Sequence, residues 1–371
     1  MKTIRFSISL LGIIILLSCN KNDDTGSLYE LNLVNLPERE LLLSDLVSDI
    51  GYIPLEGKDD ALISWINGVR ITEDLIIVWD YTKIFIYNRK GELKSVIDKR
   101  GRGPGEYPSM LDVDIDPESR RLTILSSKSL YSYNIDDGDF IETTTLPGYI
   151  FAFKIMDKEH YYFGFPPVNG QPQANNTIVS NRGDTLHKRI NNILFSPDVN
   201  VGFMGEILSY RSAKGIYFKE MMNDTLFSIT LDRGFQPYAV FNTGQYRLTP
   251  QKRIYITDQR RHELMFTDGF FETKNHLFIG VAHNRQNYLA ALNKSSGEEY
   301  RFENGIENNI DGGLPLKLIH ICNDTLLIGI ALAADIINHQ PDASFSSSEF
   351  SKLKNNINEN DNPVLVVYNL K

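Results

Sequence analysis

The sequence contains no apolar segment long enough to cross a lipid bilayer. The apolar stretch near the N-terminus, Phe6 to Leu17, is shorter than the roughly 20 residues that a membrane-spanning helix requires. It follows Lys2 and Arg5, and this order of charged and apolar residues is typical of a secretory signal. Any attachment of the mature protein to a membrane would therefore be through a lipid alone.

The tetrapeptide Leu16-Leu17-Ser18-Cys19 resembles a bacterial lipobox, in which the cysteine is acylated and becomes the first residue of the mature protein. We predict a signal peptide over residues 1–18, lipidation of Cys19 and a polar tether over residues 19–40. An ordinary signal with a chance cysteine is the alternative. Lys21 and the acidic residues after it resemble a signal for the outer membrane and the cell surface. A hydrated spacer, and a location on the periplasmic face, is the alternative.

Cysteine is scarce, because the chain has Cys19, Cys322 and no other. With Cys19 acylated, no intramolecular disulfide can form. We expect Cys322 to be a small apolar residue within a strand. Burial must then stabilise the fold, and 371 residues of which 42% are hydrophobic suffice for a large core.

Positive charge is also in deficit. The chain has 38 Lys and Arg residues against 47 Asp and Glu, a formal net charge of −9, and loss of Lys2 and Arg5 with the signal makes it −11. This balance argues against a nucleic-acid partner. Catalytic motifs are missing as well, since the sequence has no Gly-x-Ser-x-Gly, His-Glu-x-x-His or Cys-x-x-Cys pattern.

Long helical periodicity is scarce, and short alternating strands with turn signals between them fill most of the chain. One pattern recurs five times: an apolar strand ends in a polar residue, a turn contains glycine, and a second strand returns. Glycine suits such a turn because it takes a positive φ without a Cβ clash. The turn glycines are Gly91, Gly138, Gly183, Gly234 and Gly297.

The spacing of these glycines matches propeller blades of four strands, with one insertion before the last. The chain ends in Pro363 to Lys371, which has the pattern of a third strand and lacks a returning strand. We predict that Asp49 to Leu55 supplies that strand and closes the ring, which removes exposed sheet edges. The predicted fold is an all-β, six-bladed β-propeller over residues 41–371, with short helical insertions in the last two blades.

Several segments resemble the six-bladed β-propeller lipoproteins of anaerobic Gram-negative gut bacteria, a TolB-like or NHL-like family. They are Tyr52–Glu56, Gly101–Tyr107, Asn223–Leu226 with Gln236–Tyr238, Asn309–Gly313 and Asn362–Leu365. The resemblance covers about Leu41 to Lys371. It implies the fold and the location, but the family has no settled biochemical activity to carry over.

The stretch from Asp98 to Pro108, DKRGRGPGEYP, lies between the last predicted strand of blade one and the first of blade two. A phosphate-binding loop would be followed by a helix, whereas the residues after Pro108 alternate like a strand, so we exclude a nucleotide site. Two interpretations stay open. Either Arg100 or Arg102 pairs with Glu106 while Tyr107 caps the channel, or these side chains line a ligand pocket at the channel mouth.

Two further groups of polar residues are candidates for a site. Asp112, Asp114 and Asp116 share one face of a predicted strand, where a calcium ion or pairing with arginine would satisfy their charge. Asn309 and Asp311 lie in a second polar loop, as ligand-binding residues or as an Asx turn. Calcium is the cofactor that the aspartates would hold, and no other cofactor is predicted.

These observations predict a lipid-anchored module of the outer membrane that binds a glycan or peptide at the channel mouth or docks an outer-membrane protein. One alternative is a hydrolase or lyase with a polar or metal-assisted site in the central channel, because a propeller can assemble a site from residues far apart in the sequence. Another is a structural partner of an outer-membrane transport complex. Fold analogy alone does not separate these functions.

Overall fold

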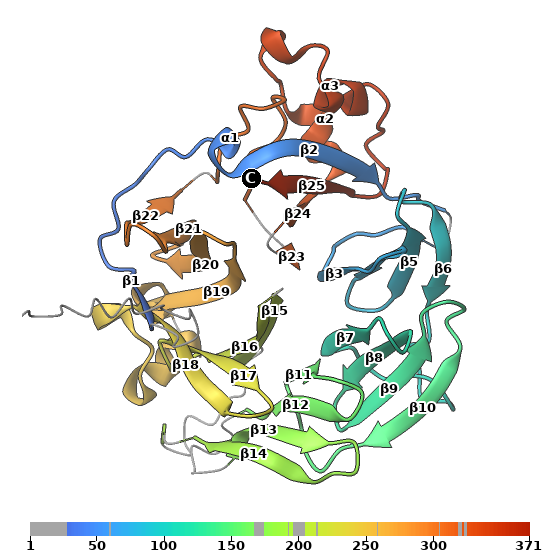
Figure 1. Cartoon of the computed structure of the whole chain (residues 1–371), viewed down its shortest axis with the longest axis vertical. Coiled ribbons are helices and arrows are strands. Elements are labelled where there is room, and N and C mark those ends of the chain that lie inside the picture. The colour runs from blue at the N-terminus through green and yellow to red at the C-terminus, as the bar shows by residue number, and fades with distance from the viewer. Residues whose placement is uncertain are drawn as a thin grey trace, which may run out of the picture.

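The computed structural model describes residues 28–58, 61–166, 174–191, 193–195, 205–212, 214–257, 259–303, 305–317, 321–322 and 325–371. The predicted signal peptide and Cys19 lie outside these residues. Six sheets form a ring around a central channel, as Figure 1 shows in the view down the channel. No helix in the described part of the chain has the length and apolar character needed to cross a membrane.

Blades one to three each contain four antiparallel strands in chain order. Blade one contains β3 (Gly68–Ile71), β4 (Leu75–Trp79), β5 (Ile84–Asn88) and β6 (Leu93–Ile97). Blade two contains β7 (Asp112–Asp116), β8 (Arg121–Ser126), β9 (Ser129–Asn134) and β10 (Phe140–Thr145). Blade three contains β11 (Ala152–Ile155), β12 (His160–Gly164), β13 (Ala174–Ser180) and β14 (Thr185–Ile190). The first strand of each blade lies at the channel and the fourth at the outside of the disc.

Blades four and five continue this order, and blade six combines a strand from the N-terminal part of the chain, β2, with the last three strands. Blade four contains β15 (Ile207–Ser212), β16 (Gly215–Glu220), β17 (Thr225–Thr230) and β18 (Gly234–Asn242). Blade five contains β19 (Met265–Glu272), β20 (His276–His283), β21 (Gln286–Asn293) and β22 (Glu299–Phe302). Blade six contains β23 (Ile321–Cys322), β24 (Leu326–Ala331), β25 (Val364–Leu370) and β2 (Val47–Pro54).

The ring closes as the sequence predicts. β2 pairs antiparallel with β25, from Val47 opposite Leu370 to Pro54 opposite Val364. The outermost strand of blade six therefore comes from the N-terminal part of the chain and its other strands from the C-terminal part. This pairing satisfies the outer edge of β25, which would otherwise present unpaired backbone groups.

Apolar packing between neighbouring blades forms the core. Because successive side chains of a strand point to opposite faces of the sheet, each inner strand can contact both neighbouring blades. In β4, Leu75 and Ile77 pack toward blade two, whereas Ile76 and Val78 pack toward blade six. Six such apolar clusters fill the six interfaces between blades, which explains the nearly continuous apolar runs in the inner strands.

The five predicted turn glycines all connect the third and fourth strands of a blade, and all have positive φ. Gly91 shows why no other residue fits its position. Its φ is 85°, and a Cβ there would lie 2.1 Å from the carbonyl oxygen of Pro54 at the end of β2. The first hairpin thus packs directly against the strand that closes the ring.

The segment before β2 is part of the fold, although the sequence placed residues up to 40 in a tether. β1 (Tyr29–Asn32) adds a fifth strand, parallel to β18, at the outside of blade four. The chain then crosses blade five, where Glu38 pairs with Arg301 of β22, and enters the short helix α1 (Leu43–Leu46) before β2. Figure 1 shows this segment running around the outside of the disc from blade four to blade six.

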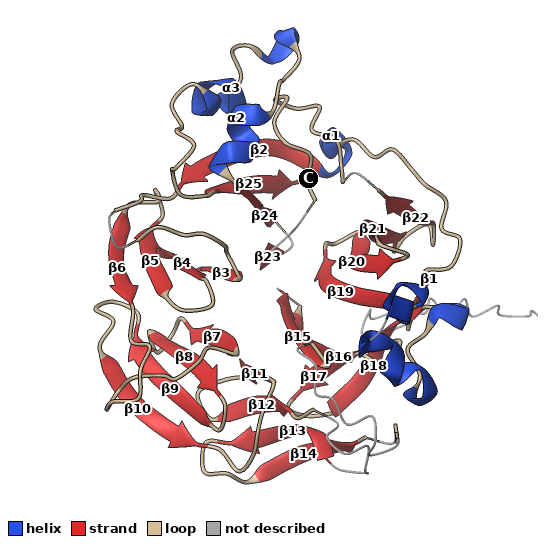
Figure 2. Cartoon of the chain, turned by 180° about the vertical axis from the view of Figure 1, so that it is seen from behind, coloured by secondary structure: helices blue, strands red, loops and turns tan. Residues whose placement is uncertain are grey.

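Helical insertions occur in the last two blades, as predicted. The 3-10 helices η3 (Gly244–Tyr246), η4 (Pro250–Thr257) and η5 (Gln259–Glu263) lie between blades four and five, and α2 (Ala333–Asn338), η6 (Ala343–Phe345) and α3 (Glu349–Lys354) lie between β24 and β25. Figure 2 shows both groups toward the outside of the disc, and η5 also contributes residues to the lining of the central cavity.

Ile50 tests the closure of the ring. This β2 side chain is buried between blades five and six, so Ile50→Ala is expected to lower the free energy of unfolding by about 3 kcal/mol through lost burial and a residual cavity. Urea denaturation would measure this change. Asp49→Ala, at the neighbouring exposed position of the same strand, is the control. Equal stability of the two variants would contradict the importance of this contact.

Candidate functional site in the central channel

The main cavity of the described structure lies at the centre of the ring and has a volume of about 1460 Å³. Its lining comes from the innermost strands, from the adjoining ends of second and third strands such as β16 and β21, and from loops next to them. The volume exceeds the roughly 300–1,000 Å³ that is typical of sites for small molecules. The cavity can therefore hold a ligand of several linked units.

Aromatic side chains of blade one surround part of the opening. Trp65 and Tyr81 both line the cavity, yet they are 52% and 61% exposed. Trp79 lines the cavity beside them, and its ring lies over Gly68, where a Cβ would come within 2.1 Å of it. Trp65 and Trp79 are the two tryptophans of the whole chain.

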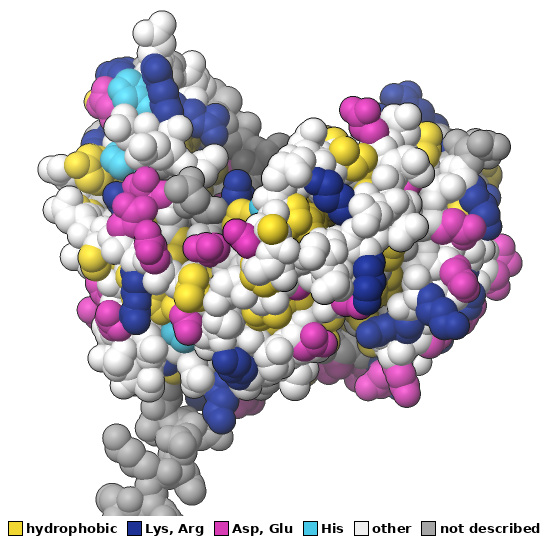
Figure 3. All heavy atoms as spheres, turned by 90° about the horizontal axis from the view of Figure 1, so that it is seen from above, with side chains coloured by type: hydrophobic (Ala, Val, Ile, Leu, Met, Phe, Trp, Pro, Cys, Tyr) yellow, Lys and Arg dark blue, Asp and Glu magenta, His cyan; other side chains and the backbone are white. Residues whose placement is uncertain are grey.

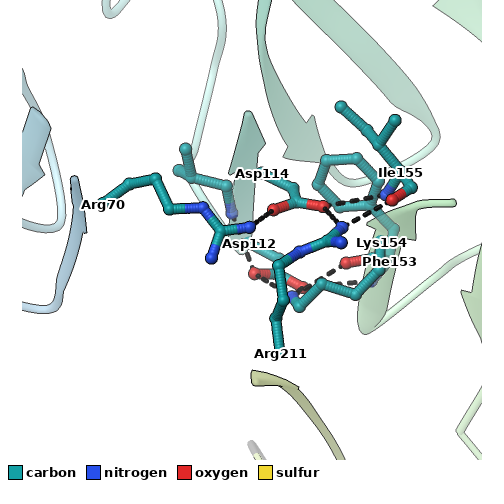
Figure 4. A network of polar contacts seen from close by, with 8 residues as sticks. Arg70, Asp112, Asp114, Phe153, Lys154, Ile155 and Arg211 are labelled. Carbon is teal, nitrogen blue, oxygen red and sulfur yellow. Dashed lines mark hydrogen bonds and ion pairs between the residues drawn. The ribbon is translucent and has the colours of Figure 1, made fainter. Parts of the chain in front are cut away.

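Asp114 lies at the centre of a polar network deeper in the channel (Figure 4). Its Oδ1 lies 3.3 Å from a guanidinium nitrogen of Arg70 in β3, and its Oδ2 lies 2.6 Å from one of Arg211 in β15. The same Oδ2 accepts a 2.8 Å hydrogen bond from the backbone N–H of Ile155 in β11. One carboxylate in β7 thus connects the innermost strands of four blades.

Asp112 makes a second set of contacts of the same kind. Its Oδ2 accepts hydrogen bonds from the backbone N–H of Phe153, at 3.0 Å, and from Nζ of Lys154, at 2.9 Å. Asp112 and Asp114 are two residues apart, and so are the N–H groups of Phe153 and Ile155 that they bind. The two carboxylates therefore join β7 to β11 in place of a backbone ladder, as Figure 4 shows.

The charge of Asp114 is maintained by its partners. The residue is 4% exposed, and burial by itself would raise the pKa of the carboxyl group. The positive charges of Arg211 and Arg70 outweigh burial and lower this pKa. Asp114 is therefore a firmly ionised structural anion, and it holds both arginines in position at the channel.

Lys219, near the end of β16, is a different kind of group. The residue lines the cavity and is 4% exposed. Its Nζ donates one long hydrogen bond, 3.4 Å, to the backbone oxygen of Glu220, and no carboxylate of the described residues forms an ion pair with it. Burial lowers its pKa to about 8. A buried lysine without an anionic partner is costly to keep charged.

The four predicted residues of the Asp98–Pro108 loop do not line the cavity. Arg100 and Arg102 are exposed on the loop surface. Glu106 accepts a 2.8 Å hydrogen bond from the backbone N–H of Gly103, within the loop itself. Tyr107 is fully buried between blades one and two, and its hydroxyl donates to the backbone oxygen of Thr82 at 2.6 Å. The glycines and prolines of this loop shape a structural crossover, and Tyr107 does not cap the channel.

Asn309 and Asp311 also lie away from the cavity, at the closure of the ring. Asp311 accepts hydrogen bonds of 2.8 Å from the hydroxyl of Tyr52 in β2 and from Nδ2 of Asn308. Asn309 exchanges hydrogen bonds with the backbone and side chain of Ser44 in α1. Two of the segments that carry the family resemblance, Tyr52–Glu56 and Asn309–Gly313, thus contact each other.

The three aspartates predicted on one strand face have separate roles. Asp112 and Asp114 have cationic partners, which is the pairing alternative, whereas Asp116 caps a turn by accepting a 3.1 Å hydrogen bond from the N–H of Glu118. No three His, Cys, Asp or Glu side chains in the described ranges lie close enough together to hold a metal ion.

The cavity residues that sequence reasoning missed come from blades one, three and four. They are Trp65, Arg70, Trp79, Tyr81, Lys154, Arg211 and Lys219. A usable signal existed for two of them, because Lys154 and Lys219 interrupt apolar strand sequences, Ala152-Phe-Lys-Ile155 and Ile216-Tyr-Phe-Lys219. A charged residue inside an apolar run predicts a buried ion pair or a functional group.

The ring of six four-stranded blades around a lined channel defines the molecule as a six-bladed β-propeller. The family model described as a domain of unknown function, DUF4934, matches residues 28–369, so the chain belongs to the DUF4934 family.

Two solved structures are similar to the chain. A predicted exported protein of Bacteroides fragilis has a TM-score of 0.69 and 14% identity, covering 93% of this chain and 100% of its own. A member of the DUF4221 family from Bacteroides vulgatus has a TM-score of 0.48 and 12% identity, covering 88% of this chain and 97% of its own. The first similarity supports the fold. No curated protein matches the chain.

The Asp114 network generates a stability prediction. Asp114→Asn leaves Arg70 and Arg211 without their anion and should lower the free energy of unfolding by about 3 kcal/mol at pH 7. Because folding lowers the pKa of Asp114, its contribution is present above the ordinary pKa of aspartate, near 4, and is lost as the pH falls through the folded-state value. The stabilities of wild type and variant should therefore converge in acid.

Urea denaturation at pH 7 and at pH 3 would measure this difference. Asp116→Asn, in the same strand but at an exposed turn, is the matched control, because the amide oxygen of asparagine can still accept the hydrogen bond from Glu118. A gap between wild type and Asp114→Asn that stayed constant from pH 7 to pH 3 would contradict the assignment.

Proposed function

We propose that this protein is a lipid-anchored binding module of the outer membrane that holds a glycan at the mouth of its central channel. The observation that supports the proposal is the pair of exposed rings of Trp65 and Tyr81 at the opening of a cavity of about 1460 Å³. Large exposed apolar groups at a concave surface are typical of binding sites.

The chemistry of the lining favours a glycan over a peptide. The flat faces of aromatic rings can pack against the C–H faces of pyranose rings while the tyrosine hydroxyl keeps a polar contact. Five side-chain amides share the same cavity: Asn67, Gln259, Asn284, Gln286 and Asn287. An amide offers both donors and an acceptor, which matches sugar hydroxyl groups that are themselves donors and acceptors.

The proposed location follows from the N-terminal sequence. The short apolar stretch and the lipobox-like Leu16–Cys19 favour export and acylation, and a protein of the same fold from Bacteroides fragilis is described as a predicted exported protein. We place the propeller on the outer membrane facing the cell surface, with the periplasmic face as the alternative.

Both tryptophans line the cavity, so intrinsic fluorescence reports directly on its occupancy. Titration with neutral and acidic hexasaccharides is expected to change tryptophan emission for at least one of them, and Tyr81→Ala should weaken that binding at least tenfold while keeping both reporters. Tyr149→Ala removes an equally exposed tyrosine, 58% against 61%, outside the cavity and should bind like wild type. Emission changes with peptides and with none of the saccharides would refute the glycan assignment.

Fractionation of cells tests the lipid anchor. Wild-type protein is expected in the outer-membrane fraction, with an N-terminal peptide that starts at an acylated Cys19 and has the corresponding added mass. Cys19→Ser should move the protein to the soluble fraction. A mature N-terminus beyond Cys19 would show an ordinary secretory signal instead.

A further inference from the structure

The charge of the cavity lining is opposite to that of the chain. The whole chain has a formal net charge of −9, and basic and acidic side chains are mixed over the outer face seen in Figure 3. The described lining of the cavity, however, contains seven Lys and Arg residues against five Asp and Glu: Arg70, Lys154, Arg211, Lys219, Arg261, Arg285 and Lys317 against Asp112, Asp114, Glu220, Asp268 and Glu303.

The acidic side chains of the lining are mostly neutralised by fixed partners. Asp112 binds Lys154, and Asp114 binds Arg70 and Arg211. Glu220 binds Arg189 at 2.7 Å, and Glu303 binds Arg301 at 2.7 Å. Both of these arginines lie outside the lining.

The basic side chains of the lining that have no carboxylate partner among the described residues differ in depth. Arg285 and Lys317 are exposed, where they raise the local concentration of anions through long-range attraction. Lys219 is buried. It lies in β16 opposite Leu208 of β15, and both residues line the cavity. The lining therefore provides an exposed positive entrance and one buried ammonium group.

We propose that the cavity binds an acidic glycan and that Lys219 forms an ion pair with a carboxylate of that ligand. This inference rests on the proposed glycan-binding function and specifies its substrate class. A single ammonium group matches one negative charge, and the carboxylate supplies the anionic partner that the described structure does not provide. In the bound state, the ion pair with the ligand offsets the desolvation free energy of the buried Lys219 ammonium group.

The surroundings of Lys219 determine how binding depends on pH. Glu220, Asp224 and Asp268 favour its charged form, whereas Arg247 and burial disfavour it, with the result that its pKa is lowered to about 8. At pH 8.5 the free protein therefore holds Lys219 mostly as the neutral amine. A carboxylate ligand stabilises the charged form, so binding should be accompanied by proton uptake.

Calorimetry with trigalacturonate as the probe tests the proposal. Titrations at pH 8.5 in two buffers of different ionisation enthalpy measure the protons taken up per bound ligand. Wild type should take up roughly half a proton or more per ligand, the fraction expected for a group that titrates near pH 8.

Lys219→Met keeps the length of the side chain and removes the charge, so it should fold with an unchanged or higher Tm. It should bind trigalacturonate at least tenfold more weakly and without proton uptake. Lys94→Met, at an exposed position in β6, is the matched control and should behave like wild type. The methyl ester of trigalacturonate should bind wild type and Lys219→Met equally.

Two results would overturn the inference, and they leave the proposed function distinguishable from it. Equal binding of trigalacturonate to wild type and Lys219→Met, with Tyr81→Ala weakening both, would keep a glycan site and exclude the ion pair. Binding of neutral hexasaccharides but not trigalacturonate would also keep a glycan site and exclude the ion pair. Lys219-dependent proton uptake with glutarate, when no saccharide binds, would support the anion site and refute the glycan function.

Discussion

When Val47–Pro54 pairs with Val364–Leu370, strands from the N-terminal and C-terminal parts of the chain enter one sheet, and every other feature of the molecule depends on that contact. A blade is apolar on both faces, so it is stable only between two neighbours. In an open array of sheets the first and last would each expose a face and an edge to water. Closure gives all six blades two neighbours and makes each side chain at the channel part of one continuous wall.

Several of the segments that carry the family resemblance contact one another where the ring closes. Tyr52 in the closing strand binds Asp311, and Gly313 of the same loop lies so close to Tyr52 that a Cβ there would come within 2.5 Å of the hydroxyl. Asn362, just before β25, accepts a hydrogen bond from Ile63 and donates two to backbone oxygens of the chain between blades six and one. Three of the five segments thus fix the junction where the ring closes.

The architecture was predictable because local chemistry determines it. A glycine with positive φ at each hairpin and an apolar run in each inner strand are properties of a few adjacent residues, so Gly91 or Leu75–Trp79 can be interpreted in isolation. The last strand has the pattern of a third strand with no fourth strand after it, and this local pattern predicted the closure of the ring. Only the extent of the N-terminal tether was wrong, because the four residues of β1 are too few to show a pattern.

The site could not be predicted in this way, because its residues come from several blades that lie far apart in the sequence. Nothing in the sequence near Arg70 indicates that it shares a carboxylate with Arg211, which lies in another blade. The loop that looked most distinctive, Gly101–Tyr107, is rich in glycine and proline because its backbone must turn tightly, and its tyrosine fills an interface between blades. The glycine- and proline-rich loop therefore has a structural role, whereas the cavity residues lie in strands that carry no recognisable motif.

The parallel alignment of β1 with β18 would have a mechanical consequence if the protein is anchored through its N-terminus, as proposed above. A pull along the axis of β1 would load its hydrogen bonds to Ala239–Asn242 together in shear, so that they would not open one after another. The outer strand of blade four would carry the load first. Such a load would then reach the closing strand β2 only after this short ladder had failed.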